Sequence, residues 1–279
     1  MTDMLRRFEL LGYALVVILI VIWQIEDQEP QERRPRPAPG YEAPSPPPSS
    51  PRGTIITIDA ERKTGNSVGT AYAISRQGLW LTAAHVARDC ERMALLTGPN
   101  KGIGVQNFWV HPHYDLAILQ TRPFGQISLQ GADTLPTRGD LGFHMGFPSG
   151  KPGDVMSRKM SQGQMRTRGY VQRLEPVDIW AERARIPDSL ATLGGISGGP
   201  VFNAQGQVVG STVASTVRRG RIYTTPIASL LDMLDFAGKR WGNQGQPASA
   251  KGLTERDFVA TGNRLRKNRA VMQVYCQIT

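Results

Sequence analysis

Three short segments contain the residue types that acyl transfer needs. They are LTAAHV with His85, HYDLAIL with Asp115 and GGISGGP with Ser197. A serine hydroxyl is activated by a weak base that takes its proton, and histidine titrates near neutral pH. The imidazole needs an acceptor on its other nitrogen, which a carboxylate supplies. These residue types therefore indicate a nucleophile, a general base and an orienting acid.

The glycines around the serine suit the same chemistry. The developing oxyanion needs converging backbone N–H groups, and a glycine beside the serine allows the turn that aims them. Gly195 to Gly199 also match the G-x-S-x-G pattern of the α/β-hydrolase nucleophile turn. Each segment alone is a weak signal, because a lone histidine is more often structural. The order of the residues along the chain must decide.

That order, together with the pattern of expected strands and helices, excludes two of the three common serine-hydrolase arrangements. The α/β-hydrolase order is serine, acid, histidine. It is impossible here, because Ser197 follows all four histidines, which are His85, His111, His113 and His144. The subtilisin order needs an early acid such as Asp59 and alternating helices and strands, which the sequence lacks. The order histidine, aspartate, serine on an all-β scaffold remains.

The segments that must position these residues read mostly as strands. From Thr54 onward, short apolar or alternating stretches are separated by Gly, Asn, Pro and Ser, which is typical of antiparallel sandwiches or barrels. Residues 226–240 instead predict a helix, with a proline at the start and Gly238 near the end. Thr254 to Asp257 resembles a capping box before a short helix, and AVMQVYC a last strand.

Together, these segments resemble trypsin-like serine proteases of the chymotrypsin fold. NSVGTAYAISRQGLWLTAAHV is similar to their strand-turn-strand ending in Thr-Ala-Ala-His, DLAIL to the aspartate strand, and GGISGGPVFNAQGQVVG to the serine loop and its hairpin. The separation of 30 residues between His85 and Asp115 is more like the bacterial Deg-type branch than the vertebrate digestive enzymes. The resemblance covers roughly residues 54–240.

The resemblance implies an all-β fold of two six-stranded antiparallel β-barrels, with the site in the cleft between them and a C-terminal helix after them. The protease domain is expected at 54–240, with barrels at about 54–135 and 136–225 and the helix at 226–240. Residues 241–279 would form a C-terminal extension. That extension is too short for the PDZ domain that Deg-type proteases usually carry, so a member without this domain is expected.

The resemblance also assigns roles for a serine endopeptidase. Ser197 would attack the scissile carbonyl, His85 would act as general base and then general acid, and Asp115 would orient His85. The amides of Gly195 and Ser197 would form the oxyanion hole. No cofactor and no metal are expected. The substrate is a polypeptide, and its pocket would be lined by Ala191, Thr192, Leu193, Ser211, Thr212 and Val213.

Two positions near the serine depart from well-known relatives. Trypsin-type enzymes carry an aspartate where this chain has Ala191, so the pocket is expected to favour small or medium apolar residues. Ile196 replaces an aspartate that pairs with a newly cut amino terminus in zymogen-activated relatives. Activation by such cleavage is therefore not expected, and packing or a partner must hold the loop. The alternative is a catalytically silent or latent relative that binds peptides or acts as a scaffold.

The N-terminal residues predict a membrane anchor. Residues 10–25 form an apolar run, somewhat short of the ~20 residues that span a bilayer comfortably. The run has no polar face, which argues against a core helix, and no small-residue site for signal-peptide cleavage. A cytoplasmic stub and single transmembrane anchor are expected within 1–28, followed by a proline-rich linker at 29–53.

The lipid bilayer is thus an expected partner, through residues 10–25. The Lys/Arg bias around the run does not decide its orientation. The short N-terminal tail before a long soluble domain favours a protease domain outside the cytoplasm, in a bacterial periplasm.

Composition excludes other classes. An apolar content of 40% and a charged content of 20% exclude wholesale disorder. The net charge of +10 is spread along the chain without a nucleic-acid module, so nucleic acid is not an expected partner. His111 and His113 lack further ligands at metal-binding spacing. Cys90 and Cys276 would form either one disulfide or two buried thiols.

Overall fold

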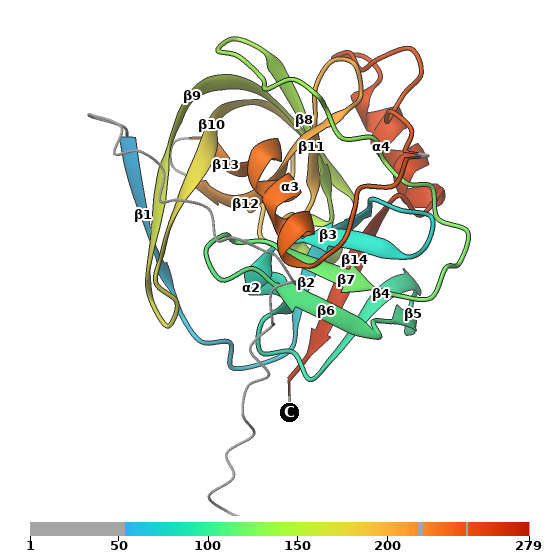
Figure 1. Ribbon diagram of the computed structural model, residues 1–279. Coiled ribbons are helices and arrows are strands. Elements are labelled where there is room, and N and C mark those ends of the chain that lie inside the picture. Colours follow the sequence, from blue (N-terminus) through green and yellow to red (C-terminus); the bar gives the residue numbers. More distant parts are fainter. Residues whose placement is uncertain (1–53, 217–219, 244, 279) are drawn as a thin grey trace, which may run out of the picture. The chain divides into compact units, whose positions relative to one another are not determined.

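Figure 1 shows the computed structural model, which describes residues 54–216, 220–243 and 245–278. Two β-sheets of seven strands each contain most of the regular secondary structure in these residues, and the helices are few and short. The expectation of an all-β fold is therefore confirmed. The predicted anchor at 10–25 and linker at 29–53 lie outside the described residues. Within the described ranges, no helix has the length and apolar content needed to cross a bilayer.

The first barrel carries the histidine and aspartate segments. Its strand order is β5-β4-β14-β2-β3-β7-β6. The outermost strands, β5 and β6, follow each other in the chain. Between them, the Val105 amide donates to the Met93 carbonyl of β4, and the Gln106 amide donates to the Gln120 carbonyl of β7. The sheet therefore closes into a barrel. Its strands are β2 (Ser67–Ala73), β3 (Leu79–Thr82), β4 (Arg92–Gly98), β5 (Lys101–Gly104), β6 (Asn107–Val110), β7 (Ala117–Gln120) and β14 (Val271–Gln277).

The second barrel carries the serine loop. Its strand order is β1-β9-β10-β13-β12-β11-β8, and β8 also pairs with β9, which closes a ring of strands. β1 lies outside that ring and runs parallel to β9. The strands are β1 (Thr54–Ala60), β8 (Leu141–Gly146), β9 (Gly153–Gly169), β10 (Arg173–Ile186), β11 (Pro200–Phe202), β12 (Val208–Thr216) and β13 (Arg221–Pro226).

The closed ring of the second barrel has the expected six strands, whereas the expected count was wrong for the first barrel. Each sheet has seven strands, for two different reasons. In the first barrel, the segment that closes the ring is divided into β5 and β6. In the second, β1 is added to the edge of a closed ring.

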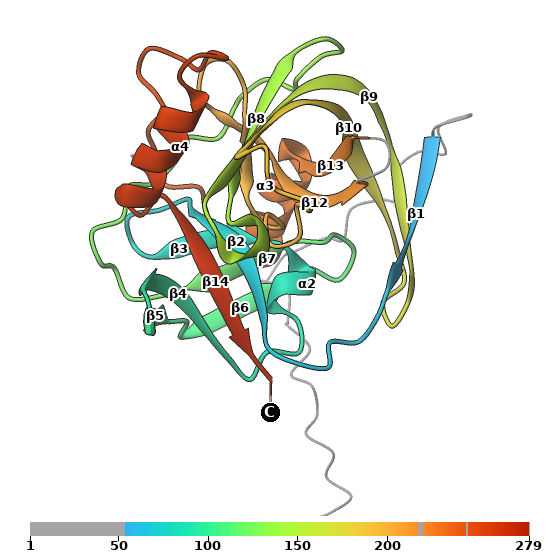
Figure 2. The same ribbon diagram turned by 180° about the vertical axis from the view of Figure 1, so that it is seen from behind.

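The first described strand belongs to the second barrel, and the last strand belongs to the first barrel, which is the reverse of their order in the chain. The last strand, β14, pairs antiparallel with both β2 and β4, and its Val274 lies opposite Gly69 and Leu95 (Figure 2). The first strand, β1, pairs with the second barrel. The barrels therefore do not follow the expected boundaries at 54–135 and 136–225, and residues 241–279 supply a strand of the first barrel.

Helices occupy the connections between strands. α3 (Ile227–Phe236) follows β13 and confirms the expected helix, with its buried side chains in the main apolar cluster. α4 (Phe258–Lys267) begins after the predicted capping box, where the Thr254 amide donates to Oδ1 of Asp257 at 2.8 Å. Arg266 of α4 binds both oxygens of Asp154 on β9 at 2.7 and 2.8 Å, which attaches the helix to the second barrel. Among the described residues, the remaining helices are α2 (Ala84–Ala87) and a single 3-10 turn, η1 (Pro148–Gly150).

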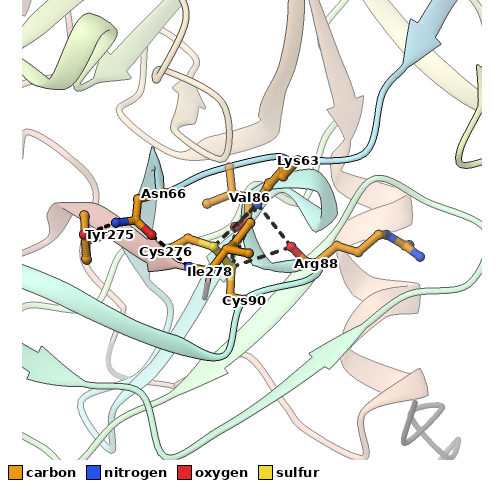
Figure 3. Close-up of a disulfide and its surroundings, with 8 residues drawn as sticks. All are labelled: Lys63, Asn66, Val86, Arg88, Cys90, Tyr275, Cys276 and Ile278. Carbon is orange, nitrogen blue, oxygen red and sulfur yellow. Dashed lines mark hydrogen bonds between the residues drawn. A yellow bond between two sulfur atoms is a disulfide. The ribbon is translucent and has the colours of Figure 1, made fainter. Parts of the chain in front are cut away.

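A disulfide attaches the C-terminal strand to the first barrel. It joins Cys90, which follows α2, to Cys276 of β14, and thereby decides between the two alternatives that the sequence left open (Figure 3). The segment before β2 packs beside it. There, Lys63 Nζ donates to the carbonyls of Val86 and Arg88 at 2.9 and 3.1 Å. The bridge and this lysine therefore both contact the segment that contains α2.

Replacing both cysteines with alanine should lower the free energy of unfolding by about 2–4 kcal/mol. The reason is that the bridge joins positions 186 residues apart and so restricts the unfolded chain. Urea denaturation with and without a thiol reductant measures the effect. Reduced wild-type protein should match the double variant, and reductant should leave the variant unchanged. An unfolding curve of the wild type that does not respond to reductant would contradict this account.

Candidate active site

His85 and Asp115 are brought together by two paired strands. β3 ends at Thr82, which pairs with Ala117 at the start of β7. His85 lies just after the first of these ends and Asp115 just before the second. His85 Nδ1 lies 2.6 Å from Asp115 Oδ2, and the His85 amide donates to Asp115 Oδ1 at 2.9 Å. The carboxylate therefore holds both the ring and the backbone of the histidine.

The exposures of the two side chains suit a base and its orienting acid. The Asp115 side chain is 3% exposed, whereas that of His85 is 45% exposed. Burial raises the pKa of Asp115, but His85 and Arg173 outweigh this effect and bring its pKa below the ordinary value. Asp115 is therefore ionised at neutral pH. With Nδ1–H donating to it, Nε2 of His85 keeps its lone pair and can accept a proton.

The serine loop is seated against the strand that leads to His85. Gly198 has φ +84°, and a Cβ there would lie 2.2 Å from the Thr70 carbonyl oxygen and 2.7 Å from the Ala83 amide nitrogen. Only glycine fits such a close approach in this conformation. The Ser197 carbonyl also accepts the Thr70 amide at 2.8 Å. Ser197 is thus attached to β2 and lies beside the residues just before His85.

Thr70 is a structural contact that the sequence analysis missed. Its hydroxyl donates to the Gly195 carbonyl at 2.8 Å and accepts the Phe147 amide at 3.0 Å. Thr70 is fully buried, and it reaches the serine loop from the first barrel. The available signal was a single threonine in GTAYA, an otherwise largely apolar stretch of strand.

The two amides predicted for an oxyanion hole donate no hydrogen bond to the described part of the protein. Gly195 has φ +99°, and a Cβ there would lie 2.6 Å from the Phe147 carbonyl oxygen. Among the described residues, neither the Gly195 nor the Ser197 amide donates to a protein acceptor. Both N–H groups therefore remain available to bind an anionic oxygen.

Ile196 is part of the hydrophobic core. It is 1% exposed and lies in one apolar cluster with Leu193 and side chains of the second barrel, which are Ala132, Val155, Trp180, Val201, Val209 and Ile222. The apolar packing of the Ile196 side chain therefore attaches the serine loop to the second barrel.

The residues predicted for the substrate pocket fall into two groups. Ala191 and Thr192 are exposed. The other four are 4% exposed or less, namely Leu193, Ser211, Thr212 and Val213. The Thr212 hydroxyl, for example, lies 3.1 Å from Nδ1 of the buried His144. Only the first group presents surface to a substrate in this conformation.

Two other histidines have structural surroundings. His111 accepts the amides of His113 and Tyr114 on Nδ1 and lies 3.1 Å from Asp232 Oδ2 through Nε2. Burial lowers the pKa of both His111 and His144 to about 3, so both are neutral at pH 7. Over the part of the chain that the structure describes, His, Cys, Asp and Glu form no cluster that could hold a metal ion.

Known proteins with similar sequences are peptidases. Residues 69–210, just over half of the chain, match the model of the trypsin-like peptidase domain. A protein named probable periplasmic serine endoprotease DegP-like, from Pseudomonas putida strain F1, is 26% identical over 188 residues. The matched region covers 67% of this chain and 36% of that protein, and the protein of the same name from strain W619 gives the same figures. The chain thus spans about a third of the length of these relatives.

Solved structures show the same fold. The Rv3671c protease from M. tuberculosis in its active form is similar with a TM-score of 0.53 at 16% identity, over 75% of this chain and 100% of that chain. Its inactive form has a TM-score of 0.52 at 19% identity, over 63% of this chain and 89% of that chain. The fold and the match to residues 69–210 confirm the expected resemblance: the chain belongs to the trypsin-like peptidase family.

Proposed function

We propose that this protein is a serine endopeptidase in which Ser197 is the nucleophile, His85 the general base and Asp115 the orienting acid. The observation that carries the proposal is the 2.6 Å contact between His85 Nδ1 and Asp115 Oδ2. This contact lies next to the end of β3, and the loop of Ser197 packs against the same end of β3 and against β2. Family membership supports the same chemistry.

In this mechanism, Ser197 Oγ attacks the scissile carbonyl carbon while His85 Nε2 takes the hydroxyl proton. The Asp115 carboxylate stabilises the imidazolium, and the Gly195 and Ser197 amides bind the oxyanion. The carbon–nitrogen bond then breaks, and His85 gives its proton to the leaving amine. Water repeats the sequence on the acyl-enzyme and releases the acid. No cofactor or metal takes part.

The substrate is a polypeptide, cleaved after a small or medium apolar residue. The support for this preference is Ala191, which is exposed six positions before Ser197 and provides no negative charge for a Lys or Arg side chain. Relatives named as periplasmic support a location outside the cytoplasm. Attachment to the bilayer through residues 10–25 is part of the same proposal and rests on the apolar character of that segment.

Profiling on a peptide library tests the activity. The wild-type chain should cleave after small or medium apolar residues, and Ser197→Ala should lower kcat/KM by at least about 10³-fold because the nucleophile is lost. The alanine variant is also the control for contaminating proteases. Folded wild-type protein without cleavage would favour the alternative of a silent peptide-binding relative. Cleavage after Lys or Arg would contradict the predicted preference of the pocket but not the proposed peptidase activity.

Ile196→Asp should lower the free energy of unfolding by about 3–5 kcal/mol, since it buries an unpaired carboxylate among apolar side chains. The conservative control, Ile196→Val, should lower it by about 0.5–1.5 kcal/mol and keep peptidase activity. Urea denaturation and the peptide assay measure both effects. An aspartate variant as stable and active as the wild type would show that apolar packing does not hold the serine loop.

A further inference from the structure

Strand β10 places two charged side chains inward and an apolar one outward. Along this strand Arg173 is 9% exposed and Glu175 is fully buried, whereas Leu174 between them is 46% exposed. A half-buried strand ordinarily has the opposite alternation, with apolar side chains inward. Burying two ionisable groups is unfavourable unless they are paired, so the partners of this pair are informative.

Arg173 Nε and Glu175 Oε1 lie 3.7 Å apart, and the closer partners of both side chains belong to the Asp115 segment of the first barrel. Arg173 Nη2 lies 3.0 Å from Asp115 Oδ1, and Arg173 Nη1 donates to the Tyr114 carbonyl at 3.2 Å. Glu175 Oε2 accepts the Asp115 amide at 2.7 Å. Arg173 thus fixes the carboxylate, and Glu175 fixes the backbone of the same residue.

The two carboxylate oxygens of Asp115 have different partners. Oδ2 of Asp115 faces His85, whereas Oδ1 receives both the His85 amide and Arg173. The arginine therefore leaves Oδ2 for the imidazole and prevents the carboxylate from rotating freely. Any shift of β10 relative to the first barrel would disturb the orientation of Asp115.

The charges at this junction depend on one another. The titratable or charged groups that act on Asp115 and Glu175 are His85, Arg173, Tyr114 and, from the segment before β2, Lys63. Burial and the charge of Asp115 raise the pKa of Glu175 to about 8, although Arg173 opposes this. Removal of Arg173 would leave two carboxyl groups side by side, and one of them would keep its proton.

We propose that Arg173 and Glu175 are positioning residues, which act from the second barrel to hold Asp115 in the orientation and charge state that His85 requires. Replacing the pair by apolar residues would avoid the desolvation of buried charges. The specific contacts to Asp115 therefore indicate a role beyond packing. The inference rests on the proposed function of Ser197, His85 and Asp115.

The rate of Ser197 labelling by a fluorophosphonate probe tests this proposal without knowledge of the substrate. The full chain is compared with Arg173→Met, Arg173→Lys, Glu175→Gln and the double variant Arg173→Met/Glu175→Gln. Arg173→Met should slow labelling at least tenfold, because Asp115 Oδ1 loses the contact that fixes the carboxylate. It should also move the rise in labelling rate that follows ionisation of Glu175 to higher pH, because Arg173 no longer lowers the pKa of Glu175. Arg173→Lys, which retains the charge, should restore part of the rate.

The double variant separates positioning from packing. Glutamine can still accept the Asp115 amide but does not ionise, so Arg173→Met/Glu175→Gln should label as fast as Arg173→Met at pH 7 and should lack the shifted rise at high pH. A purely structural loss would give the two variants the same pH profile. Glu175→Gln alone should remove a rise in labelling rate near pH 8, where ionisation of Glu175 adds a negative charge that favours the imidazolium.

The outcomes distinguish this inference from the proposed function. Folded wild-type protein that is not labelled at Ser197 would contradict the proposed function and the inference with it. Wild-type protein that is labelled, together with variants that keep its rate and pH profile, would overturn the inference alone. If Arg173→Met does not fold, as judged by circular dichroism, Arg173→Lys and Glu175→Gln decide. A slower lysine variant or the loss of the rise near pH 8 supports positioning, and wild-type behaviour in both overturns it.

Discussion

A carboxylate that is 3% exposed can stay ionised only if charged or polar groups surround it, and Asp115 meets this requirement from two directions. His85 approaches from the first barrel and Arg173 from the second, at 2.6 and 3.0 Å. Both barrels must dock in one relative position for these contacts to form together. The geometry of the candidate site therefore depends on how the barrels are joined.

Several independent connections join them. Thr70 of β2 holds the serine loop of the second barrel through its amide and its hydroxyl. The described chain starts on the second barrel with β1 and ends in the first with β14, so the polypeptide crosses between the barrels in both directions. The Cys90–Cys276 disulfide lies within the first barrel and attaches β14 beside the segment that carries His85. Thr70 and the crossing chain therefore join the two barrels at the junction that positions Asp115.

The sequence was sufficient to predict features that depend on residue types, on their order along the chain or on a local pattern. The four histidines precede Ser197, which excluded the α/β-hydrolase order, and the proline and glycine near its two ends predicted α3. It was not sufficient for contacts between distant segments. No local pattern pointed to Arg173 and Glu175, because alternation along a strand ordinarily places charged residues outward, and only the partner barrel makes them buried. The place of β14 between β2 and β4 likewise follows from long-range pairing, which no local pattern specifies.

The central claim is that Ser197 acts as nucleophile beside the His85–Asp115 pair. A crystal structure of the protein after reaction with a peptidyl phosphonate tests it most directly. The account predicts phosphorus bonded to Ser197 Oγ, with a phosphonyl oxygen within hydrogen-bonding distance of the Gly195 and Ser197 amides and with His85 Nε2 facing the adduct. An adduct on another residue, or a phosphonyl oxygen turned away from both amides, would contradict the account.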